Sequence, residues 1–160
     1  MSTPNLLDAV GLVKENERIA RDTYADAAQK IINPMGRKLF EELSLFEAYH
    51  YDRLAALERS LQESGTFISY ESKAFPQPPI FEIKAAKDPG QKSVMGILSG
   101  AMDLEKEAEK AYADLASQVI DRQGHDMFNR LAEEEHIHYR ILMEAYWSLT
   151  NLGEWTWSRP

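Results

Sequence analysis

Apolar residues recur through most of the chain at alternating steps of three and four, the spacing of helices that pack with a seven-residue repeat. The first stripe is Leu6, Val10, Val13, Glu17, Ala20, Tyr24, Ala27 and Ile31. The second is Phe40, Leu43, Glu47, His50, Leu54, Leu57 and Leu61. The third is Val94, Leu98, Ala101, Glu105, Ala108, Tyr112, Leu115 and Val119. The fourth is Phe128, Leu131, Glu135, His138, Leu142, Ala145 and Leu149. Four helices are predicted, and each directs one glutamate into the core.

Capping and breaking residues set the expected helix limits. Thr3 with Pro4, Asn33 with Pro34, and Asp88 with Pro89 each suit a helix start, and Gly153 suits an end. We expect helices over about 4–32, 34–64, 89–120 and 124–152, with a turn at 121–124.

A long crossover is expected over residues 65–88, where Phe75-Pro76-Gln77-Pro78-Pro79 cannot be helical. About 23 extended residues span roughly 75 Å, enough to return along a helix of roughly 43 Å. The fold class predicted is therefore all-α: a four-helix bundle running up, down, down and up, as a single domain over residues 1–160.

The two halves of the chain repeat one another at a spacing of 88 residues. Glu17 and Glu105 are identical residues 88 positions apart. The same separation relates the pairs Tyr24/Tyr112, Glu47/Glu135, His50/His138, Ala20/Ala108, Gly36/Gly124 and Phe40/Phe128. The halves are expected to be copies of one helical hairpin.

The repeated glutamates should lie at one height in the bundle. Antiparallel neighbours face each other at positions equidistant from their turn, and Glu17 and Glu47 are centred on residue 32. Glu105 and Glu135 are likewise centred on residue 120. A histidine follows the second glutamate of each hairpin by three residues, so it faces the same layer.

Four carboxylates in an apolar core would repel one another, and burial of even one unpaired charge costs several kcal/mol. Two divalent cations would supply the missing charge, with neutral imidazoles completing the coordination. Glutamate and histidine together favour iron or manganese over magnesium or calcium, and six ligands shared by two ions suit iron better than zinc. The predicted metal ligands are Glu17, Glu47, His50, Glu105, Glu135 and His138, holding two iron ions, with manganese or a mixed pair as the alternative.

Composition narrows the remaining choices. The 160 residues include no cysteine, which excludes disulfides and cysteine-ligated metals, and the net charge of −8 argues against a nucleic-acid partner. No apolar run is long enough for a membrane span, and residues 1–5 lack a signal-peptide pattern. We expect a cytoplasmic protein.

The chain resembles the rubrerythrin-type branch of the ferritin-like superfamily across all four helices. The motifs that carry this resemblance are ERIARDTY at 17–24, EAYH at 47–50, EKEAEKAY at 105–112 and EHIH at 135–138. It implies that Glu47 and Glu135 bridge the two ions and that each ion takes one histidine and one terminal glutamate. It also implies that Tyr24 and Tyr112 donate hydrogen bonds to the carboxylate ligands.

Two positions depart from the family. Many rubrerythrins carry a further glutamate where this chain has Ala108, and their rubredoxin module needs four cysteines that this chain does not have. Electrons are therefore expected from an external donor protein or from the substrate.

The expected reaction is reduction of hydrogen peroxide, as a defence against oxidative stress. Ferritin-like oxidation of Fe(II) by O2 and catalase-like chemistry at two manganese ions use nearly the same ligands and stay open. A purely structural or partner-binding bundle fits the heptads but leaves four buried carboxylates uncompensated. A homodimer is compatible with the size. Asp26 and Asp114 repeat but point away from the layer, and His125 and His136 lie off the stripe, so all four are expected at the surface.

Overall fold

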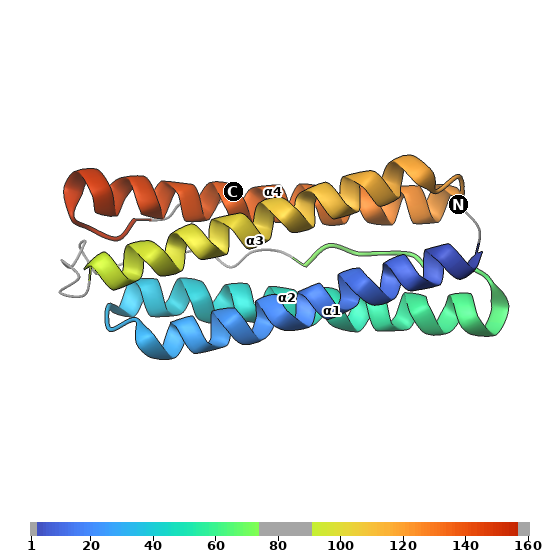
Figure 1. Cartoon of the computed structure of the whole chain (residues 1–160), viewed down its shortest axis with the longest axis horizontal. Helices are drawn as coiled ribbons and strands as arrows, with labels where there is room; N and C mark the ends of the chain where they lie inside the picture. The colour runs from blue at the N-terminus through green and yellow to red at the C-terminus, as the bar shows by residue number, and fades with distance from the viewer. Residues whose placement is uncertain (1–2, 74–90, 157–160) are drawn as a thin grey trace.

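Four helices lie side by side as a bundle in the computed structural model, which describes residues 3–73 and 91–156 (Figure 1). Their bounds are Thr3–Lys30 for α1, Pro34–Ser64 for α2, Gln91–Gln118 for α3 and Arg122–Leu152 for α4. Helices α1 and α4 run in one direction along the bundle, and α2 and α3 run in the other (Figure 1). The predicted all-α bundle, up, down, down and up, is confirmed. No helix within the described ranges is long and apolar enough to cross a membrane.

Apart from the start of α3, which borders undescribed residues, three helix ends differ by two residues from those expected, and capping residues explain two of these differences. Helix α1 ends at Lys30, since Asn33 is extended (φ −63°, ψ 127°) and its side chain accepts hydrogen bonds from the backbone N–H groups of Met35 and Gly36. Helix α3 ends at Gln118. Helix α4 begins at Arg122 because the side chain of Asp121 accepts a hydrogen bond from the Gly124 N–H at 3.2 Å.

The start of the crossover lies against the bundle. Helix α2 ends at Gly65, whose φ of 68° is the left-handed conformation that favours glycine, and its N–H donates to the Leu61 carbonyl. Phe67, Ile68 and Tyr70 then pack against the core at the end of the bundle where α2 stops. The extended stretch expected at 75–79 and the expected cap at Asp88 lie outside the described residues.

The buried apolar side chains form two clusters, one toward each end of the bundle. The first includes Tyr24, Phe40, Leu43, Leu98 and Leu142. The second includes their repeat partners, which are Tyr112, Phe128, Leu131, Val10 and Leu54. The duplicated sequence thus builds the two halves of the core with matching residues, and the glutamate layer lies between them.

Repeated glycines allow aromatic side chains to close each end of the bundle. A Cβ atom on Gly36 would lie 2.5 Å from the ring of the fully buried Trp155, and one on Gly124 would lie 2.5 Å from the ring of Phe67. Both distances are shorter than any ordinary carbon contact, so these positions require glycine because of space.

Replacement of Gly124 by alanine is expected to destabilise the protein by about 1–3 kcal/mol, because the new methyl group overlaps Phe67. The matched control is Gly100→Ala in α3, where no described atom lies within 4 Å of the added Cβ. That variant should gain up to about 1 kcal/mol from helix propensity. Chemical denaturation measures both changes, and equal effects of the two substitutions would contradict this packing.

Candidate metal centre

The six predicted ligands lie together in the layer between the two apolar clusters. Each helix contributes one glutamate, and α2 and α4 each add a histidine one turn further along. None of the six exposes more than 2% of its surface, and the list is Glu17, Glu47, His50, Glu105, Glu135 and His138. Six ionisable side chains are thus fully buried at one height of the bundle.

Their ligand atoms form two overlapping groups of four. One group contains Glu17, Glu47, His50 and Glu135, and the other contains Glu47, Glu105, Glu135 and His138. Within each group, one candidate donor atom per residue lies within 4.8 Å of the others. Glu47 and Glu135 belong to both groups, which is the placement that a carboxylate bridging two ions requires.

Both imidazoles direct Nδ1 toward the carboxylates. His50 Nδ1 lies 2.7 Å from Glu135 Oε1 and 3.2 Å from Glu47 Oε2. His138 Nδ1 lies 3.3 Å from Glu47 Oε1 and 3.6 Å from Glu105 Oε1. The two rings are nearly parallel, with centroids 6.1 Å apart. Each histidine therefore offers one nitrogen to a different end of the same carboxylate set.

Several buried carboxylate oxygens receive no hydrogen bond of acceptable geometry from the residues that the structure describes. Three of them belong to predicted ligands, namely Glu47 Oε1, Glu105 Oε2 and Glu135 Oε1, and the fourth is Glu134 Oε1. An acceptor left unsatisfied in the interior costs about 1–3 kcal/mol, and more if it is charged. The three ligand oxygens and the imidazole nitrogens form the mixed donor set of a first-row metal, so the residues fit a pair of such ions.

Protons balance the charge of this layer when no cation is bound. Burial and the charge of Glu47 raise the pKa of Glu17 to about 8, and burial with the neighbouring carboxylates raises the pKa of Glu135 well above its usual range. Burial also opposes ionisation of Glu47 and Glu105, but hydrogen bonds from neighbouring carboxyl groups and imidazoles keep the pKa of both below the ordinary value.

The neighbouring carboxylates raise the pKa of both histidines. Burial alone would lower the pKa of an imidazole, but the facing carboxylates raise that of His138 to about 9 and that of His50 well above its usual range. Near neutral pH the layer therefore holds two neutral carboxyl groups, two carboxylates and two imidazolium groups. Four protons make it neutral, and two divalent cations carry the same four charges.

Two buried tyrosines connect the two hairpins through hydrogen bonds. The hydroxyl of Tyr24 in α1 donates to Glu105 Oε1 in α3 at 2.9 Å, and the hydroxyl of Tyr112 in α3 donates to Glu17 Oε1 in α1. Burial and the adjacent carboxylate hold the pKa of each phenol well above its ordinary value, so both remain hydrogen-bond donors. Each hairpin thus orients one glutamate of the other, either Glu105 or Glu17.

One functional contact is not predicted by the repeat. Glu134 is buried, and its Oε2 lies 2.8 Å from His50 Nε2 and accepts a hydrogen bond from the hydroxyl of Tyr70. Once a cation displaced the proton on Nδ1, the proton held on Nε2 by this carboxylate would leave the Nδ1 lone pair facing the layer. The residue 88 positions before Glu134 is Phe46. Its ring packs edge-on against the ring of His138, with ring centroids 4.9 Å apart. The two histidines therefore have different surroundings.

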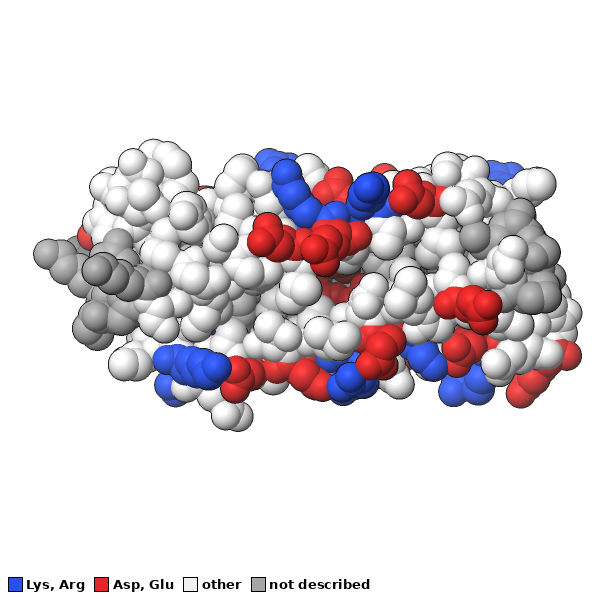
Figure 2. Space-filling view, in the orientation of Figure 1, with Lys and Arg blue, Asp and Glu red and all other residues white. Residues whose placement is uncertain are grey.

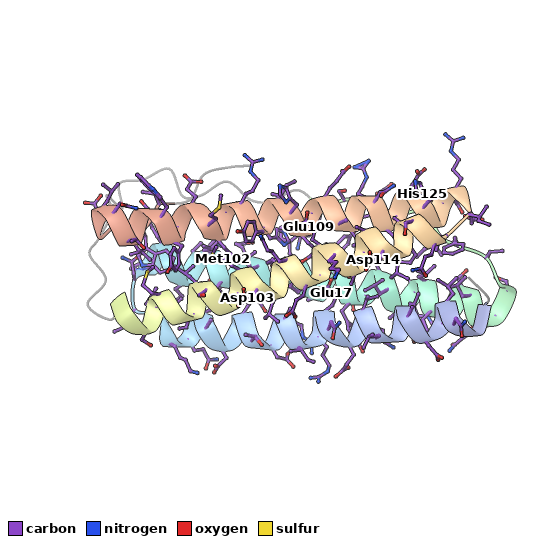
Figure 3. The ribbon with its side chains drawn as sticks, turned by 45° about the horizontal axis from the view of Figure 1, so that its top comes forward. Glu17, Met102, Asp103, Glu109, Asp114 and His125 are labelled. Atoms are coloured by element: carbon purple, nitrogen blue, oxygen red, sulfur yellow. The ribbon has the colours of Figure 1, made fainter. Side chains whose placement is uncertain are left out.

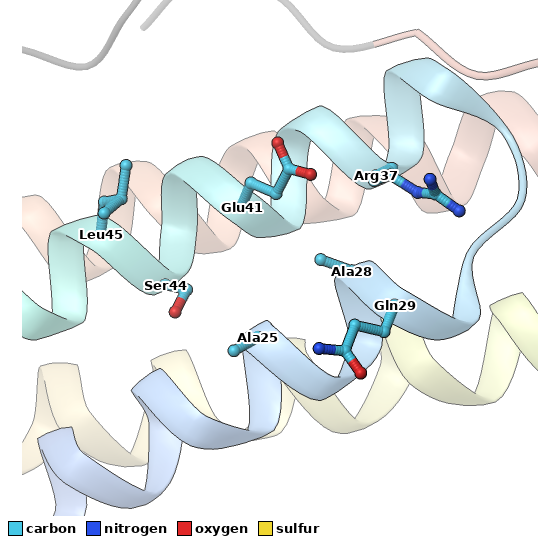
Figure 4. Close-up of a pocket in the computed structure, with 7 residues that line it drawn as sticks. All are labelled: Ala25, Ala28, Gln29, Arg37, Glu41, Ser44 and Leu45. Atoms are coloured by element: carbon cyan, nitrogen blue, oxygen red, sulfur yellow. The ribbon is translucent and has the colours of Figure 1, made fainter.

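Other candidate side chains lie away from the layer. Asp26 and Asp114 are exposed, as are His125 and His136. Figure 3 shows Glu17 between α1 and α3 at mid-bundle, with Asp114 and His125 well toward one end. A surface cavity of about 510 Å³ lies between α1 and α2 near Ala25, Ala28 and Arg37 and includes none of the six predicted ligands (Figure 4).

These features define a ferritin-like four-helix bundle with a buried cluster of four glutamates and two histidines that is able to hold metal. The family model described as Rubrerythrin matches residues 67–146, which are 80 of the 160 residues. The chain therefore belongs to the rubrerythrin family. No rubredoxin domain is evident in this chain, which contains no cysteine.

A solved structure supports the fold. A hypothetical protein from Pyrococcus furiosus superimposes with a TM-score of 0.72 and 23% sequence identity, covering 91% of this chain and 90% of that one. At this identity the similarity concerns the fold alone. A search of curated proteins found no match.

Metal binding should displace the protons that balance the layer. Near pH 7, loading of chelator-treated protein should release about four protons per chain, one each from Glu17, Glu135, His50 and His138. As the pH rises through about 8 and 9, Glu17 and His138 lose their protons before metal arrives, so fewer are released and the apparent affinity increases. A weakly buffered titration with a pH indicator measures the number.

The matched control is Glu17→Gln, which should release about one proton fewer because this side chain does not ionise. Proton release that is the same in both proteins, or affinity that does not change between pH 6 and pH 9, would contradict the proposed charge balance.

Proposed function

We propose that this protein is a di-iron redox enzyme that reduces hydrogen peroxide to water with electrons from an external donor protein. The observation that supports this most strongly is the pair of overlapping four-residue groups that share Glu47 and Glu135. Membership of the rubrerythrin family supports a redox role for that cluster. When bound and reduced, an iron pair would supply the two electrons that cleavage of an O–O bond consumes.

The chain contributes the geometry of the site. Tyr24 and Tyr112 fix the terminal carboxylates through hydrogen bonds between the two hairpins. Glu134 and Tyr70 fix the ring of His50 from the opposite side. Since Tyr24, Tyr112 and Glu134 are buried and Tyr70 is partly buried, the ligand oxygens and nitrogens are held in place before a cation arrives, which reduces the reorganisation needed at the reacting centre.

Apolar surroundings limit the access of water to the layer. Phe46 covers His138 and His50 with centroid distances of 4.9 and 6.5 Å, and it exposes only 2% of its surface. The two core clusters close the layer from above and below. The low dielectric of these apolar surroundings strengthens the electrostatic attraction between carboxylates and a cation.

The reaction H2O2 + 2 e⁻ + 2 H⁺ → 2 H2O can be tested by anaerobic reduction of the iron-loaded protein followed by stopped-flow mixing with peroxide or with O2. We expect peroxide to oxidise the centre at least about tenfold faster than O2 does, a difference of about 1.4 kcal/mol in activation free energy. Absorbance of the oxidised centre reports both rates.

Glu135→Gln should abolish the rapid phase, whereas Glu133→Gln, two residues away on the exposed side of α4, should keep it. Faster oxidation by O2 than by peroxide would refute peroxide reduction and favour the ferroxidase alternative, which uses the same ligands. If only the manganese-loaded protein converts peroxide rapidly, and does so with release of O2, the di-manganese alternative is favoured.

A further inference from the structure

A cavity of about 250 Å³ opens between α1 and α3 at the side of the glutamate layer. Glu17, Glu105 and Glu135 line it, so three of the predicted ligands can be reached from this side. Figure 2 shows the corresponding hollow near the middle of this face, with acidic residues visible inside it. The cavity therefore provides a path from solvent to the reacting centre.

The opposite side of the layer is closed. There His50 Nε2 faces Glu134, and Glu134 is in turn covered by Tyr70 from the beginning of the crossover. Tyr70 also stacks at a tilt against Tyr49 of α2, with centroids 6.1 Å apart. A substrate is thus expected to approach by the α1/α3 side.

The cavity walls between the carboxylates and solvent include four apolar side chains. Ile19 and Ala20 come from α1, and Leu104 and Ala108 come from α3. Ala20 and Ala108 are repeat partners, and their small side chains leave the cavity beside the glutamate layer open. A larger side chain at position 108 would occupy part of that space.

The available volume exceeds what hydrogen peroxide needs. An apolar cavity of about 150 Å³ accommodates benzene, a molecule of six non-hydrogen atoms, whereas one water molecule takes about 30 Å³ in the liquid. Hydrogen peroxide has two non-hydrogen atoms, so most of the 250 Å³ would remain for another part of the substrate. An apolar substituent on the peroxide would bury surface against the four wall residues.

The charge of the cavity selects an uncharged substituent. Glu107 lies at its exposed margin with Asn16, and no lysine, arginine or histidine belongs to the described residues that line it. An anionic hydroperoxide, such as one with a carboxylate group, would be repelled by Glu107 and would find no cationic side chain among the described lining residues.

We propose that the α1/α3 cavity binds uncharged, short-chain alkyl hydroperoxides, with the alkyl group against Ala20, Ala108 and Leu104 and the O–O group over the carboxylate layer. This inference rests on the proposed peroxidase function and specifies its substrate class. The reaction is ROOH + 2 e⁻ + 2 H⁺ → ROH + H2O: the O–O bond breaks, the alcohol and water leave, and the protons come from solvent. A reduced metal pair held by the six predicted ligands would supply the two electrons, and the external donor protein would restore them.

The test compares oxidation of the reduced, iron-loaded full chain by tert-butyl hydroperoxide and by hydrogen peroxide. In Ala108→Leu, the ratio of the two rate constants should fall at least about tenfold, because the added carbons occupy the space of the alkyl group. The matched control is Ala113→Leu, the same substitution at an exposed position of α3 outside the cavity, and it should leave the ratio unchanged.

A binding measurement gives a readout that does not depend on turnover. The methyl protons of tert-butyl alcohol, the unreactive product, should be broadened by manganese(II)-loaded wild-type protein, because the cavity holds the alcohol beside the paramagnetic ions. This broadening should be lost in Ala108→Leu and retained in Ala113→Leu at equal metal content.

The outcomes separate the two proposals. If hydrogen peroxide oxidises the wild-type centre but tert-butyl hydroperoxide does not, the substrate class is wrong and the peroxidase function stands. An unchanged rate ratio or equal broadening in folded Ala108→Leu also overturns the assignment of the cavity. If neither peroxide oxidises the centre, the proposed function fails, and the inference fails with it.

Discussion

The buried layer of four glutamates and two histidines is the constraint on which the rest of the structure depends. With all carboxyl groups ionised and both imidazoles neutral, the layer would carry four negative charges in an interior where a single unpaired charge costs several kcal/mol. The pKa shifts within the layer show that protons compensate this charge when no cation is present, on two carboxyl groups and both imidazoles. Two divalent cations would compensate it equally and would also use the oxygens that lack hydrogen-bond donors among the described residues.

The duplicated hairpin allows the bundle to accommodate this polar layer. Apolar packing is placed above and below the layer by repeat-related residues such as Phe40 and Phe128, so the helices remain associated although the core is interrupted. Tyr24 and Tyr112 then connect the two hairpins through the layer itself. The same interactions that stabilise the bundle therefore orient the ligands, and a change in helix register would disturb both.

Much of the fold and of the candidate site follows from the sequence because both rely on short-range periodicity. Heptad spacing places Glu17 and Glu105 on core-facing stripes, and equal distances from the turns place them at one height. Helix ends are less predictable, since Asn33 and Asp121 act as caps whose geometry depends on the neighbouring turn.

Glu134 was missed for a different reason. It belongs to a run of three glutamates that resembles a solvated surface, and the repeat has Phe46 in its place. Its position three residues after Leu131 and four before His138 would have indicated the core side of α4. Its contact with Tyr70 depends on where the crossover lies, and no periodic pattern describes that segment.

The most direct test of this account is the metal content of the full-length protein purified from iron-replete medium, determined by mass spectrometry together with anomalous X-ray scattering. The account predicts about two ions per chain between the four helices, as in related carboxylate bundles. It also predicts loss of both ions in Glu47→Ala, because Glu47 belongs to both ligand groups. Wild-type protein that is metal-free, with stability unchanged by Glu47→Ala, would contradict it.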